Sequence, residues 1–266
     1  MKGDIQRKLL YIVQSGQPIV NGYREIGGRY RKVANQLEGG ASLADAVQKA
    51  RLMPMEQVLT LVGEQAGKLE DAYETLAKMM DMQEAYVRRL MFAVIRSVVL
   101  AGVGVAGSYG LMRWLKLEIP VWWQVWVVVA GMVLGLLGAV LSMLSPGWRT
   151  WVRLLSTRFM LIAGVSFDET FRYLKMAGLN PGKGDAYWKL LRLSGEEADL
   201  VSTAEGAGTT ENAIQHLEKK AKDNLERWKN RLSTFMYYVG VVVALATVLA
   251  GVLAFALAGF GSLNAN

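Results

Sequence analysis

Residues able to carry covalent or metal chemistry are scarce in this chain of 266 residues. It contains no cysteine and a single histidine, His216. Without cysteine there is no thiol nucleophile, disulfide or thiolate ligand, and one histidine does not supply a multi-histidine metal site. We therefore expect a protein that is not an enzyme and that needs no cofactor.

Two glycine-rich segments partly match the sequence motifs of nucleotide-binding sites. Gly102, Gly104 and Gly107 have Gly-x-Gly-x-x-Gly spacing, but they lie inside an uncharged apolar stretch and not between a strand and a helix. Gly182 and Lys183 lie in a Pro-Gly-Lys-Gly turn that lacks the Ser or Thr of a phosphate loop. We expect neither to bind nucleotide, so an ATPase that served this protein would be a separate chain.

Two glutamates, Glu64 and Glu205, stand at matching places, each three residues before a glycine, Gly67 or Gly208. A carboxylate near a helix N-terminus accepts hydrogen bonds from unpaired backbone N–H groups, so both glutamates could be purely structural. Alternatively, Glu64, Glu205 and the glycines Gly63, Gly67 and Gly208 mark equivalent contact surfaces for other protomers or for a partner. The sequence alone leaves both interpretations open.

The two glutamates belong to an internal repeat. A shift of 141 residues superposes the segment that starts at Glu205 on the one that starts at Glu64, and each segment leads into an apolar stretch. Further upstream the shift is 148, which brings Gly164 onto Gly16, so the second copy is about seven residues shorter. Such self-similarity indicates duplicated structural units. The pairs matched at 141 are Glu64 with Glu205, Ala66 with Ala207, Gly67 with Gly208, Glu70 with Glu211, Ala72 with Ala213, and Leu76 with Leu217.

The elements that position these residues are predicted to be helices, because no strand-like alternation is present. Ser42 follows two glycines and precedes an apolar run, which indicates a helix N-cap. Gly67 should end one helix, and residues 68–89 should form the next, which continues into an apolar stretch. Such a helix would act as a semi-rigid connection.

Three apolar stretches, 91–112, 121–144 and 235–260, are long enough to cross a bilayer core, which takes roughly 20 helical residues. Arg96 lies inside the first, close enough to an end to reach the headgroups. Small residues spaced four apart predict faces for close helix packing. These are Gly102, Ala106 and Gly110 in the first span and Gly131 and Gly135 in the second.

Basic residues flank the spans on one side, which predicts that side to be cytoplasmic. The flanking residues are Arg88, Arg89, Arg96, Arg149, Arg153, Arg158, Lys229 and Arg231. We therefore expect an all-α membrane protein with two duplicated cytoplasmic helical-bundle domains and three transmembrane helices, with the N-terminus cytoplasmic and the C-terminus periplasmic. The predicted order is a first domain (1–90), a span (91–112), an outer loop (113–120), a span (121–144), a second domain (145–234), a span (235–260) and an outer tail (261–266).

The net charge of +7 does not predict nucleic-acid binding. Both predicted domains are nearly balanced in basic and acidic residues, and no basic stripe stands out. The surplus lies mainly beside the spans, where anionic lipid is the expected counterpart. We therefore expect membrane lipid, and no nucleic acid, among the binding partners.

Two segments resemble the signature of the type II secretion F domain: Gly-Gly-Ala-Ser-Leu at 39–43 and Gly-Glu-Gln-Ala-Gly-Lys-Leu at 63–69. The second copy has a degenerate version, Ala-Glu-Gly-Ala-Gly at 204–208, and the order of domains and spans is also similar to that family.

The resemblance implies a platform protein of the bacterial inner membrane that serves a type IV pilus or type II secretion machine. It further implies a homo-oligomer and three kinds of partner: a hexameric assembly or retraction ATPase, pilin or pseudopilin subunits, and other inner-membrane assembly proteins. The alternative from another class is a small transporter or channel subunit. Such proteins usually place ionisable groups at membrane mid-depth, and the second and third predicted spans contain none.

Overall fold

The structure is a computed structural model that describes residues 2–114 and 146–263. All regular elements within these two ranges are helices, as the sequence predicts. The predicted second span, 121–144, and with it Gly131 and Gly135, lies outside the described residues. The helices are α1 (Lys2–Gln14), α2 (Ile19–Ile26), α3 (Gly28–Glu38), α4 (Leu43–Lys49), α5 (Pro54–Gln65), α6 (Leu69–Trp114), α8 (Pro146–Ile162), α9 (Phe167–Met176), α10 (Tyr187–Leu190), α11 (Glu196–Gly206) and α12 (Thr210–Leu263).

The chain divides into two compact units. Unit 1 consists of Met1–Ala85 and Pro146–Leu225, and unit 2 consists of Tyr86–Ser145 and Glu226–Asn266. The buried apolar residues of unit 1 form one continuous hydrophobic cluster to which both predicted domains contribute. Its fully buried side chains include Tyr23, Leu59 and Leu76 from the first domain and Leu154 and Ile214 from the second.

Helix ends in unit 1 follow the local sequence signals. Ser42 is the N-cap of α4, as predicted, and its hydroxyl accepts a hydrogen bond from the backbone N–H of Asp45 at 3.2 Å. Gly67 follows α5 with φ of +67°, a left-handed conformation that glycine adopts without steric cost. Gly208 holds the same position after α11, with φ of +71°.

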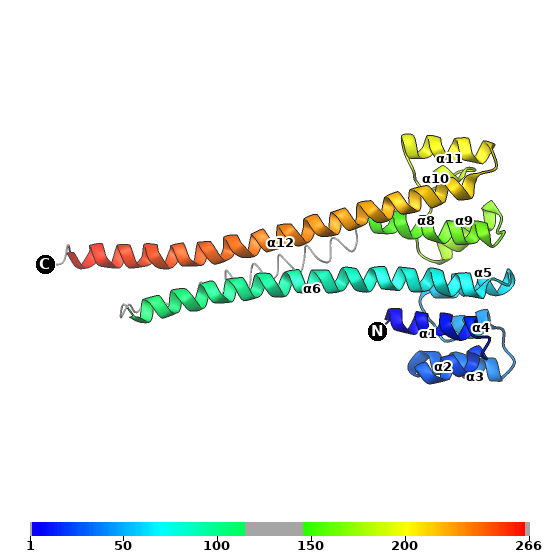
Figure 1. Cartoon of the computed structure of the whole chain (residues 1–266), viewed down its shortest axis with the longest axis horizontal. Helices are drawn as coiled ribbons and strands as arrows, with labels where there is room; N and C mark the ends of the chain where they lie inside the picture. Colours follow the sequence, from blue (N-terminus) through cyan, green and yellow to red (C-terminus); the bar gives the residue numbers. More distant parts are fainter. Residues whose placement is uncertain (1, 115–145, 264–266) are drawn as a thin grey trace. The chain divides into compact units, whose positions relative to one another are not determined.

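α6 is one uninterrupted helix of 46 residues, which confirms that the helix after Gly67 continues into the apolar stretch (Figure 1). Among the described residues, one helical stretch, Leu69–Gly107, is long and apolar enough to cross a membrane by length and composition, with a mean hydropathy of 2.0. It contains most of the predicted first span. α12 is also continuous, over 54 residues, and it includes the predicted third span.

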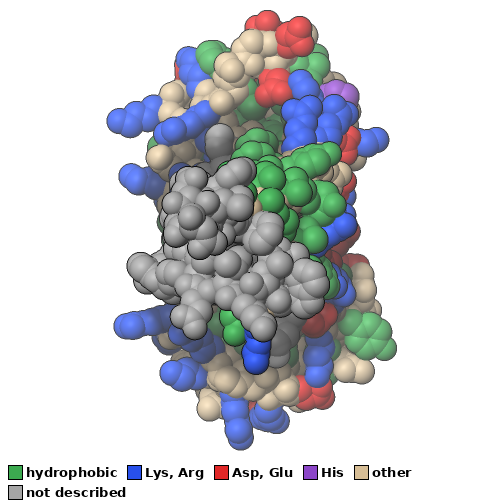
Figure 2. All heavy atoms as spheres, turned by 90° about the vertical axis from the view of Figure 1, so that its left-hand side faces the viewer, with side chains coloured by type: hydrophobic (Ala, Val, Ile, Leu, Met, Phe, Trp, Pro, Cys, Tyr) green, Lys and Arg blue, Asp and Glu red, His purple; other side chains and the backbone are tan. Residues whose placement is uncertain are grey.

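Within unit 2, α6 packs against α12. Tyr86 and Met236 are buried against each other, the guanidinium of Arg96 lies 4.4 Å from the centre of the Tyr237 ring, and Arg89 donates a hydrogen bond to the Asn230 side chain at 3.1 Å. Other large apolar side chains of these helices are exposed (Figure 2). They include Met91, Phe92, Ile95, Val99 and Val103 on α6, and Phe235, Val242, Leu245, Leu249 and Leu253 on α12.

Candidate functional site

The carboxylate of Glu64 binds the start of a neighbouring helix. Oε1 accepts the backbone N–H of Leu43 at 2.8 Å, and Oε2 accepts that of Ala44 at 2.7 Å. These donors belong to the first turn of α4, which is also capped by Ser42. The capped helix is thus α4, earlier in the chain, and not α6, which follows Gly67. Glu64 thereby ties the C-terminal end of α5 to the N-terminal end of α4.

Glu205 makes the equivalent bond in the second domain. Its Oε1 accepts the backbone N–H of Tyr187, the first residue of α10. Each glutamate therefore sits near the C-terminal end of one helix and caps the start of the preceding one. The local, structural interpretation accounts for both side chains, and their role as contacts for a partner stays a prediction.

Gly63 allows a close approach between α5 and α6. A Cβ on residue 63 would lie 2.7 Å from the Ala72 Cβ and 3.2 Å from the Lys68 carbonyl oxygen, so no larger residue fits without movement. In the second domain, a shift of 141 residues puts Ala204 in the place of Gly63 and Ala213 in the place of Ala72. The extra methyl group at Ala204 excludes an equally close approach of α11 and α12.

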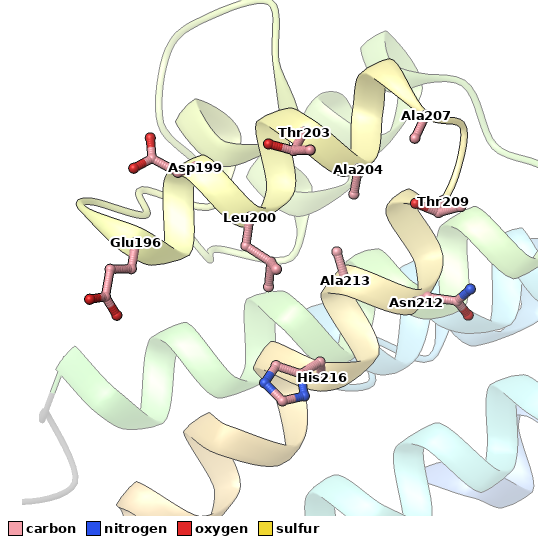
Figure 3. Close-up of a pocket in the computed structure, with 10 residues that line it drawn as sticks. All are labelled: Glu196, Asp199, Leu200, Thr203, Ala204, Ala207, Thr209, Asn212, Ala213 and His216. Carbon is pink, nitrogen blue, oxygen red and sulfur yellow. The ribbon is translucent and has the colours of Figure 1, made fainter.

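A groove of about 620 Å³ lies between α11 and α12 at this point (Figure 3). Leu200 and Ala204 of α11 point towards Ala213 and His216 of α12 across it. Acidic side chains, Glu196 and Asp199, stand at one end. The complete lining is Glu196, Asp199, Leu200, Thr203, Ala204, Ala207, Thr209, Asn212, Ala213 and His216.

The segment around Glu64 also contacts the second domain, a contact that no sequence pattern predicts. The Lys68 ammonium donates to the Ile162 carbonyl oxygen at 2.6 Å, at the last residue of α8. The Tyr173 hydroxyl donates to the Gln65 side-chain oxygen at 3.2 Å. Lys68 and Gln65 lie within the family signature at 63–69, but the signature does not reveal which residues they bind.

The predicted helix-packing residues of the first span make no close contact within the described part of the chain. Gly102, Ala106 and Gly110 are exposed, and a Cβ on Gly102 or Gly110 would meet no atom within 4 Å. Their packing role stays a prediction. The described residues also contain no group of three or more His, Cys, Asp or Glu side chains that could hold a metal ion.

The described residues thus form an all-helical protein with one helix long and apolar enough to cross a membrane. Residues 12–115 match the family model described as "Type II secretion system (T2SS), protein F". This match confirms, for these residues, the resemblance inferred from the sequence. The family comprises platform proteins rather than enzymes. No curated protein matches the chain.

Proposed function

We propose that this protein is the inner-membrane platform of a type IV pilus or type II secretion machine, where it couples a cytoplasmic hexameric ATPase to the assembly of pilin or pseudopilin subunits. One observation carries the proposal: the family match spans both the Glu64 turn and the long helix α6. A platform needs a folded surface for its partners that is continuous with a membrane anchor, and the matched residues provide both.

The proposal includes the duplication of the helical domain. It is supported by hydrogen bonds at corresponding helix ends, which coincide residue by residue. At a shift of 148, the bonds that end α1 (Ser15 to Tyr11, Gly16 to Val13, Gln17 to Ile12) match those that end α8 (Ala163 to Phe159, Gly164 to Leu161, Val165 to Met160). At 141, the bonds that end α5 (Ala66 to Val62, Gly67 to Glu64, Lys68 to Gly63) match those that end α11 (Ala207 to Thr203, Gly208 to Glu205, Thr209 to Ala204).

The difference in length between the two copies has a simple structural counterpart. The first domain has two helices, α2 and α3, between α1 and α4, whereas the second has only α9 between α8 and α10. The bonds that end α3 (Gly39 to Asn35, Gly40 to Leu37, Ala41 to Gln36) match those that end α9 (Ala177 to Tyr173, Gly178 to Lys175, Leu179 to Leu174) at a shift of 138. We infer that the second copy has lost the equivalent of α2.

Three transmembrane helices complete the proposed platform, with both domains in the cytoplasm and the tail in the periplasm. The exposed apolar side chains of α6 and α12 support the first and third spans, because such side chains are stable against lipid and costly in water. Arg88 and Arg89, just before the predicted first span, and Arg231, before the third, favour a cytoplasmic, anionic headgroup layer.

Helix continuity supports the coupling role. α6 and α12 are each one uninterrupted helix that begins in charged sequence and continues into an apolar stretch. A displacement that an ATPase imposes on the first residues of such a helix reaches its apolar part, whereas a flexible linker would absorb it.

The topology can be tested with single cysteines, because the natural chain has none. Lys49→Cys and Lys183→Cys probe exposed positions in the two domains, and Ser262→Cys probes the tail. In spheroplasts, a membrane-impermeant maleimide should label only Ser262→Cys, and permeabilisation should expose the other two. Labelling of Lys49→Cys and Lys183→Cys from opposite sides of the membrane would contradict the proposed platform.

The coupling is tested by co-elution of the full-length protein, in lipid nanodiscs, with a hexameric assembly ATPase from the same organism. We expect a stable complex and altered ATP turnover. Empty nanodiscs are the control. Failure of the full-length protein to bind any such ATPase would remove the coupling role.

A further inference from the structure

We propose that the groove between α11 and α12 receives α1 of a second copy of this protein, so that protomers associate head to tail. The inference rests on the internal repeat proposed above. It goes beyond the proposed function because it assigns a specific surface and a specific pair of residues to the association.

A corresponding contact between helices already exists within each chain. α5 of the first domain packs against α8 and α9 of the second. Met55 at the start of α5 lies 3.5 Å from the Ser156 hydroxyl, sulfur to oxygen, and Lys68 beyond its end binds the last carbonyl of α8. Phe159 lies between Ser156 and the end of α8 at helical spacing, and its side chain is 2% exposed. Leu59 in the middle of α5 is fully buried.

The corresponding residues on the other two helices are exposed. The shift of 141 brings Leu59 onto Leu200 of α11, whose side chain is 41% exposed in the groove. The shift of 148 brings Phe159 onto Tyr11 of α1, which is 67% exposed. The interface formed once inside the chain by α5 and α8 therefore has both of its halves, α11 and α1, present again and uncovered.

When two chains associate through two different surfaces, one copy of each surface stays free in the resulting dimer. The dimer would still present one free α1 and one free groove, so the contact repeats and yields a ring where the rotation closes. The occupant that this geometry calls for is consequently a second copy of the chain.

Charge complementarity supports this occupant. In the internal contact, Met55 faces Ser156. At the shift of 141, Met55 corresponds to Glu196, which lies at the acidic end of the groove (Figure 3). At the shift of 148, Ser156 corresponds to Lys8 on α1. An apolar–polar contact within the chain would thus become an ion pair between chains. Within one chain the Lys8 ammonium lies 2.6 Å from the Glu25 carboxylate, and both side chains are exposed. Such a surface ion pair contributes little to stability, so Lys8 can leave Glu25 and pair with Glu196 of another chain.

The groove also has a suitable shape. Because Ala204 replaces Gly63, α11 cannot approach α12 as α5 approaches α6, and space is left beside Leu200. A tyrosine ring brings a large apolar area with a polar tip, and such rings are favoured at protein interfaces. Tyr11 would fill the apolar part of the groove while Lys8, one turn earlier on the same helix face, reaches Glu196.

The direct test is cross-linking between two full-length chains, each with one introduced cysteine and its own affinity tag, purified together in lipid nanodiscs or mild detergent. Tyr11→Cys on one chain and Leu200→Cys on the other should form a disulfide-linked heterodimer under mild oxidation. The matched control replaces Leu200→Cys with Met176→Cys, a more exposed apolar position on α9, and should give little product.

A charge exchange tests the proposed ion pair without relying on oxidation. Lys8→Glu and Glu196→Lys, each alone, should weaken self-association by about fivefold, because each replaces an attraction by a repulsion. The double variant Lys8→Glu and Glu196→Lys should recover most of the loss. Concentration-dependent mass measurements in detergent provide the readout, and Arg31→Glu, a reversal of an exposed charge on α3, is the control.

Two results would overturn the inference. One is that the protein oligomerises but Tyr11→Cys and Leu200→Cys form no cross-link between chains. The other is that the single charge reversals leave self-association unchanged. Neither result bears on whether the protein binds an ATPase or spans the membrane. Conversely, a cross-linked oligomer that binds no ATPase would support the head-to-tail contact and refute the coupling role.

Discussion

Arg51 and Arg192 hold the same uncommon backbone conformation, 141 residues apart. Their φ angles are +53° and +59°, in the left-handed region that residues with a side chain rarely occupy. Each arginine directly follows the C-cap of a short helix, α4 or α10, and its N–H bonds a carbonyl three residues earlier at 3.0 Å. Glycine is the usual residue at this place after a helix. Both domains therefore store a small backbone strain at the same point.

Arg51→Gly should stabilise the protein. Relief of the left-handed strain favours the folded state by roughly 1 kcal/mol, although the greater freedom of glycine in the unfolded chain offsets part of this gain. Denaturant unfolding in detergent, followed by circular dichroism, measures the change. Lys49→Gly, two residues earlier within α4, should instead destabilise by about 0.5 to 1 kcal/mol. A loss of stability in Arg51→Gly would show that its side chain matters more than its backbone.

Gly63→Ala should destabilise the protein by about 1 to 3 kcal/mol, because its methyl group would lie 2.7 Å from the Ala72 Cβ and force α5 and α6 apart. Gly206→Ala is the matched control at the end of α11. A Cβ there meets no atom within 4 Å, and its backbone lies outside the left-handed region, so the substitution should be neutral or slightly stabilising. Equal unfolding midpoints for the two variants would contradict the close-approach argument.

Local signals allowed much of this fold to be predicted. The Ser42 cap, the helix end at Gly67 and the continuation of α6 into the apolar stretch all follow from residues adjacent in the sequence. The partner of Glu64 could not be predicted, because Leu43 lies 21 residues earlier and meets it only through tertiary packing. The Gly63 contact was missed for the same reason, since a glycine reveals nothing of the atoms that approach it.

Glu64→Ala should cost about 1 to 2 kcal/mol, because two N–H groups of the first turn of α4 lose their acceptor. Glu64→Gln should cost less, because its amide oxygen can still accept one of these bonds. Glu74→Ala, which removes an exposed ion pair with Lys78 within α6, should change stability by less than about 0.5 kcal/mol.

The same variants separate the two interpretations of Glu64. A capping role predicts that ATPase binding falls only in proportion to the folded fraction. If Glu64→Ala were as stable as the natural protein yet failed to bind the ATPase, the side chain would be a partner contact and its hydrogen bonds to α4 would be incidental.

The hydroxyl groups of Tyr23 and Tyr73 predict a loss of stability at alkaline pH. They lie 2.6 Å apart, and both side chains are fully buried in unit 1. Burial raises the pKa of both phenols, because an ionised oxygen in this core would lose its hydration. In the unfolded chain a tyrosine titrates near its ordinary pKa of about 10. The neutral form is thus favoured by folding, so its stabilisation is complete below about pH 10 and is lost as the pH rises further.

We expect the free energy of unfolding to be flat with respect to these groups from pH 8 to about pH 10 and to fall above it. The double variant Tyr23→Phe and Tyr73→Phe should lose part of the alkaline slope, because it removes two groups that bind protons more tightly in the folded state. Leu76→Val is the control: it lowers stability at every pH and should leave the slope intact, since it removes no titratable group. An unchanged slope in the phenylalanine variant would assign the alkaline transition to other groups.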